Sequence, residues 1–136
     1  FYHALTRKGI NDIADAVVPR SRIAEFVRAA REISTKHGVP IVFYGHAGDG
    51  NVHLHPLGQG IKPGELGGKL KAIFKDVYQA ASVLGGTVSG EHGIGFDKKA
   101  YFGNTIDKNL IQTMMKIKEA LDPNYILNPG KIFDLS

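Results

Sequence analysis

The chain has 136 residues, 43% of them hydrophobic, and a formal net charge of +4 at pH 7. This length suits one domain that buries roughly two thirds of the surface its unfolded form exposes. Cysteine is absent, which excludes disulfides, thiolate nucleophiles and iron–sulfur ligation, so any metal would need His, Asp or Glu ligands. No apolar run approaches the roughly 18 to 20 residues that span a bilayer. We therefore expect a soluble, cytoplasmic chain, with peripheral attachment at the inner face of the membrane left open.

The positive charge is concentrated in the first third of the chain. We interpret these charges as the solvent-exposed face of one helix and of the segment that leads into it. The alternatives are that they bind an anionic substrate, an acidic partner or a membrane surface. Nucleic acid is not expected, because no aromatic residues are interleaved with these charges as a stacking surface requires. The basic residues are Arg7, Lys8, Arg20, Arg22, Arg28, Arg31 and Lys36.

The first half of the chain predicts a strand, a helix and two further strands. Residues 10–18 suit a strand that ends at Pro19, and Ser21 is a candidate N-cap for a helix that Gly38 ends. Within that helix, apolar residues recur at helical spacing. Residues 40–44 and 52–57 are short apolar runs on either side of a glycine-rich loop, which predicts two neighbouring strands joined as a hairpin.

A second amphipathic helix is expected from Pro63 to Leu84, ended by Gly85 and Gly86, with a short strand at residues 87–89. The resulting order, βαββαβ, is that of ferredoxin-like sandwiches. We therefore predict an α+β fold with an antiparallel sheet backed by two helices. Residues 10–90 would form this unit, and residues 91–136 a C-terminal extension.

The extension contains a third predicted helix and a tail. Asp107 can cap a helix that carries Leu110, Met114, Ile117 and Leu121 and stops at residues 122–123. Residues 124–133 are apolar but interrupted by Pro and Gly, so we expect an extended segment with an imposed shape.

Two histidine-bearing loops are the strongest functional signal: GHAGDGNVH at residues 45–53 and SGEHGIG at residues 89–95. His46 ends one predicted strand, His53 begins the next, and Glu91 follows the last. Nitrogen and oxygen donors suit a divalent transition metal, and three protein ligands with one open position are typical of catalytic sites. His92 would then be a general base, because an imidazole can take up and release a proton near working pH. His55 shares the strand face of His53.

The alternative is that these histidines are hydrogen-bonded sheet residues and that Glu91 and His92 are polar residues on a glycine loop. Other chemistries fit less well. The chain has no Walker-type run and no third glycine after Gly93 and Gly95 for a dinucleotide fingerprint, and Ser89 lacks a nucleophile elbow. A metal-dependent hydrolase and a stand-alone metal- or ligand-binding ferredoxin-like module remain as hypotheses.

The two loops, followed by LDPN at residues 121–124 and ILNPGK at residues 126–131, resemble the C-terminal domain of FAD-linked 2-hydroxyacid oxidases. This family includes D-lactate dehydrogenases, the D subunit of glycolate oxidase and D-2-hydroxyglutarate dehydrogenase. The resemblance implies that His46, His53 and Glu91 are ligands of zinc or another divalent ion and that His92 is the catalytic base. It also implies that Asn128 lies close to the FAD, which accepts a hydride from the substrate α-carbon.

Two positions depart from the hydroxyglutarate-oxidising members. The resemblance places a substrate-binding lysine of those members at the position of Ile13, and an asparagine at the position of His55. The first departure favours a D-lactate or glycolate type of substrate.

The resemblance further implies a larger protein. An N-terminal domain would bind most of the FAD, so we expect the present chain alone to bind no FAD and to be inactive. Its contact surface with that domain should be apolar, which also favours homo-oligomer formation by the separated chain. The electron acceptor is not indicated by any residue.

Overall fold

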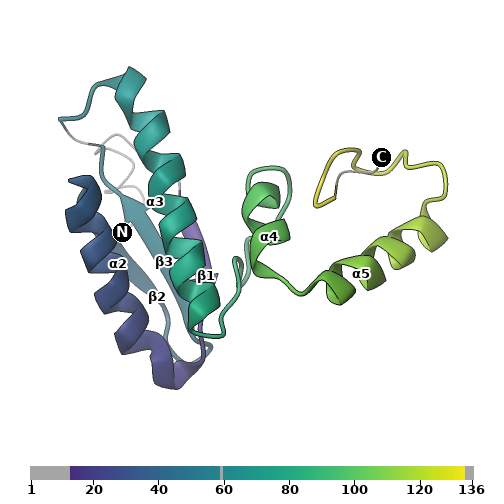
Figure 1. The fold of residues 1–136 in the computed structure, drawn as a ribbon, viewed down its shortest axis with the longest axis horizontal. Coiled ribbons are helices and arrows are strands. Elements are labelled where there is room, and N and C mark those ends of the chain that lie inside the picture. Colours follow the sequence, from purple (N-terminus) through teal and green to yellow (C-terminus); the bar gives the residue numbers. More distant parts are fainter. Residues whose placement is uncertain (1–12, 59, 134–136) are drawn as a thin grey trace.

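The computed structural model describes residues 13–58 and 60–133, so Arg7, Lys8 and residues 10–12 of the first predicted strand lie outside the described residues. Three strands, β1 (Ala14–Val17), β2 (Ile41–His46) and β3 (Asn51–Pro56), form an antiparallel sheet in the order β1-β3-β2 (Figure 1). The central strand places His53 opposite Asp15 of β1 and Tyr44 of β2. Three potentially functional side chains therefore lie in one row across one face of the sheet.

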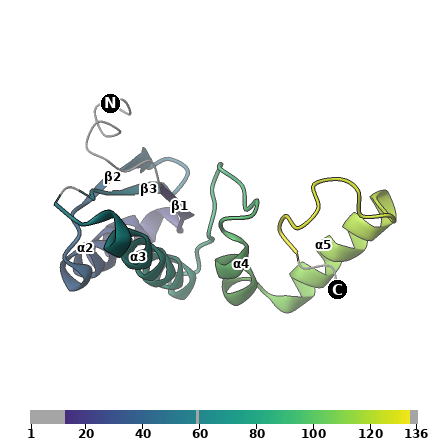
Figure 2. The ribbon, with the colours of Figure 1, turned by 90° about the horizontal axis from the view of Figure 1, so that it is seen from above.

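Helices α2 (Ile23–His37) and α3 (Pro63–Val83) cover the other face of the sheet (Figure 2). The alternation of a strand sends Ala16 and Leu54 into this layer and Asp15 and His53 away from it. The core between sheet and helices includes Phe26, Ala30, Ile73, Val77 and Ala81, all fully buried. The prediction of an α+β fold, with an antiparallel sheet backed by two helices, is confirmed.

The fourth predicted strand is reduced to one bridge. Val17 and Thr87 exchange two backbone hydrogen bonds, of 3.1 and 2.8 Å, in antiparallel sense, and no regular strand forms at residues 87–89. The chain turns away immediately afterwards, where the N–H groups of residues 90–92 bond to a side chain instead of a strand. The complete βαββαβ arrangement stays a prediction.

Ser21 as a helix N-cap is wrong. Residues Arg20–Arg22 form a 3₁₀ turn, η1, and the N-cap of α2 is Arg22, which makes no side-chain capping hydrogen bond. The reason is that the Arg22 N–H donates to the carbonyl of Pro19 at 2.7 Å and so tightens the approach around Ser21. The basic residues of this region, Arg20, Arg22, Arg28, Arg31 and Lys36, are exposed.

The C-terminal extension differs more from expectation. Helix α5 (Lys108–Leu121) begins as predicted, with Asp107 accepting from the N–H groups of Asn109 and Leu110 at 2.8 and 3.3 Å. A short helix that the sequence did not predict, α4 (Lys99–Thr105), connects it to the sheet layer and packs against α3. In both views α5 lies beyond α4, away from the sheet (Figures 1 and 2).

The tail after α5 is a series of turns, so the prediction of an extended segment is wrong. Tyr125, Asn128 and Ile132 adopt left-handed backbone angles, with φ of 50°, 47° and 64°. Such angles reverse the chain direction, and the Ile132 N–H consequently reaches the carbonyl of Gly95 at 2.8 Å.

Among the described helices, none combines the length and apolar character needed to cross a bilayer.

The hairpin between β2 and β3 depends on Gly50. Its φ is +76°, and a Cβ there would lie 2.1 Å from the carbonyl oxygen of Val18, whereas a Cβ on Gly48 meets nothing within 4 Å. We predict that Gly50→Ala lowers the free energy of unfolding by about 1–3 kcal/mol, while Gly48→Ala, the matched control, changes it by less than about 0.5 kcal/mol. Urea unfolding of both variants measures this. Equal losses would contradict the close approach.

Candidate metal centre

His53 is the buried member of the candidate site. It lies on the central strand with only 5% of its side chain exposed, and its ring is 5.1 Å from the Tyr44 ring on β2. Pairing on both sides fixes the backbone of β3, so the imidazole has little freedom. Its Nε2 atom points to the Glu91 carboxylate, with the two atoms 3.0 Å apart.

His46 and Glu91 complete the cluster from two different loops. The His46 Nε2 atom lies 3.6 Å from the same Glu91 oxygen, and the His46 and His53 rings meet edge to face at 5.7 Å. One ligand atom from each of the three residues lies within 4.8 Å of the other two. The side chains of His46 and Glu91 are 59% and 49% exposed, so the cluster is open on one side.

Gly45 allows His46 to reach this position. A Cβ at Gly45 would lie 2.3 Å from the carbonyl oxygen of Asn51 on the paired strand. Gly90 is similarly confined, because a Cβ there would lie 2.8 Å from the amide nitrogen of the Asn51 side chain. Both loops therefore approach β3 at glycines, and the residue that follows each glycine is a member of the cluster.

Asp15 anchors the loop that carries Glu91. Its Oδ2 atom accepts hydrogen bonds from the Ser89 hydroxyl at 2.9 Å and from the N–H groups of Gly90, Glu91 and His92 at 3.0, 3.1 and 3.0 Å. Burial alone would raise the pKa of this carboxyl, but these donors and the nearby Lys98 outweigh it, and the pKa lies well below its ordinary value. Asp15 is thus a carboxylate in the folded protein.

Asp15 was not among the residues predicted from the sequence to belong to the site. A signal was present, because an aspartate in the middle of an apolar strand, ADAV, needs partners if it is buried. Its partners lie more than seventy residues later in the chain, and only the three-dimensional pairing of β1 with β3 and with Thr87 brings them together.

His92 lies beside the cluster. Its ring stacks on His53, with centroids 5.0 Å apart and an interplanar angle of 15°, and its Nε2 atom is 3.8 Å from the Glu91 carboxylate. The side chain is 43% exposed. His55, which shares the face of His53, is fully buried. The structure therefore groups His92 with the three candidate ligands and keeps its ring accessible.

Asn128 belongs to the tail that follows α5, and in both views this tail lies beyond α4, away from the sheet (Figures 1 and 2). The turn before it is held by Asp122, which accepts from the N–H groups of Ile126 and Leu127 at 3.0 Å each and from the Lys118 ammonium group. Asn128 itself is exposed. The structure does not bring Asn128 together with His46, His53, Glu91 and His92.

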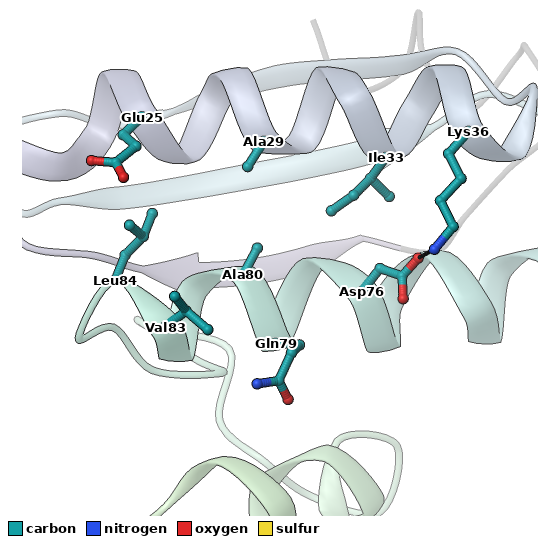
Figure 3. A pocket seen from close by; sticks show the side chains of 9 residues that line it. All are labelled: Glu25, Ala29, Ile33, Lys36, Asp76, Gln79, Ala80, Val83 and Leu84. Carbon is teal, nitrogen blue, oxygen red and sulfur yellow. Dashed lines mark hydrogen bonds and ion pairs between the residues drawn. The ribbon is translucent and has the colours of Figure 1, made fainter.

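An open hollow of about 400 Å³ lies between α2 and α3 (Figure 3). Lys36 and Asp76 bridge its two sides with an ion pair of 2.8 Å. None of the predicted site residues lines it, and the helices that form it lie on the opposite side of the sheet from His53. The candidate ligands therefore lie outside this hollow.

Comparison with known proteins shows the family of the chain. The family model described as FAD linked oxidases, C-terminal domain, matches residues 2–132. The chain belongs to this family. Membership in the FAD-linked oxidases favours the oxidoreductase hypothesis over a hydrolase or a stand-alone binding module.

Relatives of this oxidase domain have several substrates in their names. The chain is 42% identical over 122 residues to glycolate oxidase subunit GlcD of Bacillus subtilis and 38% identical over 121 residues to D-lactate dehydrogenase of Anaerostipes hadrus. Each match covers 89% of this chain and 26% of the relative. A mitochondrial D-2-hydroxyglutarate dehydrogenase of Bos taurus is 38% identical over 95% of this chain and 23% of its own length. The chain thus spans about a quarter of these relatives.

The Asp122 turn yields a pH prediction. The hydrogen bond from Lys118 is the largest influence on this carboxyl, and together with the Leu127 and Ile126 N–H groups it lowers the pKa against the opposing effect of burial. Because the pKa is lower in the folded state, the carboxylate stabilises the turn at pH values above its unfolded pKa of about 3.9. This stabilisation is lost as the pH falls through the folded pKa. We predict that the Ile126 and Leu127 amides lose hydrogen-exchange protection as the pH falls below about 4.

In Asp122→Asn the two amides should already lack hydrogen-exchange protection at pH 7. In Asp107→Asn, a change at the exposed start of α5, they should keep their protection. The measurement is the protection factor of each amide by NMR, corrected for the intrinsic exchange rate. Protection at Ile126 and Leu127 that stays constant from pH 6 to pH 3 would contradict the role of the carboxylate.

Proposed function

We propose that His46, His53 and Glu91 bind one divalent transition metal, zinc by preference. What supports this is their donor set and their spacing, with one ligand atom of each within 4.8 Å of the others. Two atoms that each lie about 2.1 Å from a tetrahedral ion are about 3.4 Å apart, close to the 3.0 and 3.6 Å separating Glu91 from the two imidazoles. When bound, such a metal supplies a Lewis acid for a substrate oxygen.

The exposure of His46 and Glu91 supports a catalytic role rather than a structural one. Structural zinc sites are closed by four protein ligands, and catalytic ones keep a position for water or substrate. Within the described part of the chain, the candidate metal-binding group consists of three residues, His46, His53 and Glu91. The side chains of His46 and Glu91 reach solvent. A substrate hydroxyl could approach from this open side.

We further propose that His92 is the general base. Its ring is stacked on His53 and remains 43% exposed, so a nitrogen can meet a substrate that enters beside the ligands. Its N–H backbone bond to Asp15 fixes where the side chain starts. A base in this position receives the hydroxyl proton of a 2-hydroxy acid while remaining free of the metal.

The overall reaction that we propose for the parent protein is oxidation of a 2-hydroxy acid of the D-lactate or glycolate type. The family and the names of the relatives support it. When bound, the flavin supplies the hydride acceptor. Identity to the lactate, glycolate and hydroxyglutarate relatives is similar, so the preference for a monocarboxylate depends on Ile13, which offers no cation for a second carboxylate.

We assign most FAD binding to an N-terminal domain of the parent protein, which is then the partner of this chain. Asn128 is our candidate for a flavin contact from this chain. It is exposed, and its left-handed backbone angle places it at a turn of the tail where a polar amide can meet a ligand.

Loss of a ligand should abolish metal binding. We predict that His46→Ala and Glu91→Ala each reduce zinc from about one equivalent to less than about a tenth, and that His37→Ala, which alters a histidine paired with Asp76 beneath the other face of the sheet, leaves zinc unchanged. Elemental analysis after dialysis gives the stoichiometry. Full zinc content in both ligand variants would refute the assignment.

Loss of the base should separate chemistry from metal binding. We predict that His92→Ala in the flavin-loaded parent protein lowers kcat by about 10²- to 10⁴-fold while zinc content stays at the wild-type level. Steady-state oxidation of D-lactate and glycolate, with elemental analysis of the same samples, makes the comparison. A decrease of less than threefold would exclude His92 as the base.

A further inference from the structure

We propose that Asp15 is the positioning residue of the metal centre, with one carboxylate oxygen directed to each of the two parts that carry the ligands. This inference rests on the proposed function, because it concerns the same three ligands. Asp15 contributes no ligand atom to the cluster. It acts through the loop of Glu91 and His92 on one side and through the ring of His53 on the other.

The Oδ2 atom organises the loop. It receives three consecutive backbone N–H groups and one hydroxyl group, all within 3.1 Å. Three successive N–H groups converge on one atom only when the backbone curls around it. This curl determines where the side chains of Glu91 and His92 leave the backbone, so a single buried oxygen places both a ligand and the base.

The Oδ1 atom faces the ring of His53. It lies 3.6 Å from His53 Nδ1, and within the described part of the chain neither buried atom has a hydrogen-bond partner. Buried polar atoms of this kind are normally paired, and a shift of about half an ångström would pair these two with each other. Histidines that bind metals through Nε2 usually donate Nδ1–H to a carboxylate, which fixes the ring and its tautomer.

Only a carboxylate can satisfy both sides. An asparagine at position 15 offers one acceptor and one donor end. With the amide group toward the loop, it meets three N–H groups that need an acceptor; with the amide group toward His53, it favours the ring form that carries its proton on Nε2. Asp15→Asn therefore disturbs either Glu91 or His53, although its size is unchanged.

The test is the zinc affinity of Asp15→Asn, with Asp122→Asn as the matched control. Asp122 is also a buried aspartate that accepts two backbone N–H groups and a lysine, but it lies in the tail. We expect the zinc dissociation constant to rise about 10- to 100-fold in Asp15→Asn and to stay within threefold in Asp122→Asn. Wild-type affinity in Asp15→Asn, or an equal loss in both variants, would overturn the inference.

Two NMR measurements separate this inference from the metal assignment. In zinc-loaded wild type, the His53 Nδ1–H proton should resonate downfield, as in a hydrogen bond to a carboxylate; an ordinary imidazole position would overturn the inference, and this measurement needs no variant. Amide exchange at Glu91 and His92 should accelerate in Asp15→Asn and not in Asp122→Asn, whether or not zinc is bound. If wild type binds no zinc, the proposed metal function fails, while unchanged exchange at these amides would refute the role of Asp15.

Discussion

A buried carboxylate on β1 connects the parts on which the candidate site depends. Asp15 lies directly opposite His53 in the sheet, and its other oxygen collects the N–H groups of residues 90–92 from a loop that follows α3. The desolvation of this charge would be costly without these donors. The loop therefore returns to the sheet at one defined place, and Glu91 arrives beside the two histidines as a consequence of that return.

Most of the sheet and helix layer could be predicted from local pattern. Short apolar runs identified β2 and β3, helical spacing identified α2 and α3, and the strong capping preference of Asp107 located the start of α5. His46 and His53 flank a hairpin loop, so their proximity followed from short-range geometry. Glu91 could be added because the preceding strand-like segment was expected at the neighbouring edge, and Thr87 does pair with β1.

The features that could not be predicted depend on contacts between distant residues. Ser21 looked like a cap, but the carbonyl of Pro19 closes a 3₁₀ turn around it. Residues 87–89 looked like a full strand, yet their continuation is drawn to Asp15. The tail looked extended because Pro and Gly indicate that a helix ends but do not indicate which turns follow. Hydrogen bonds to Asp122, from Lys118 and to the Gly95 carbonyl determine those turns. Asp15 could not be identified from the sequence either, because its hydrogen-bond partners lie more than seventy residues later in the chain.

In the proposed site both imidazoles and the Glu91 carboxylate bind one metal ion. X-ray absorption at the zinc edge on the zinc-loaded protein tests this most directly, because it reports the ligands of the bound ion itself. We expect two imidazole nitrogens and at least one oxygen at about 2.0–2.1 Å, and almost no protein-bound zinc signal in His46→Ala. A zinc ion surrounded by oxygen alone, or a spectrum of full strength and unchanged shape in that variant, would contradict the proposed ligand set.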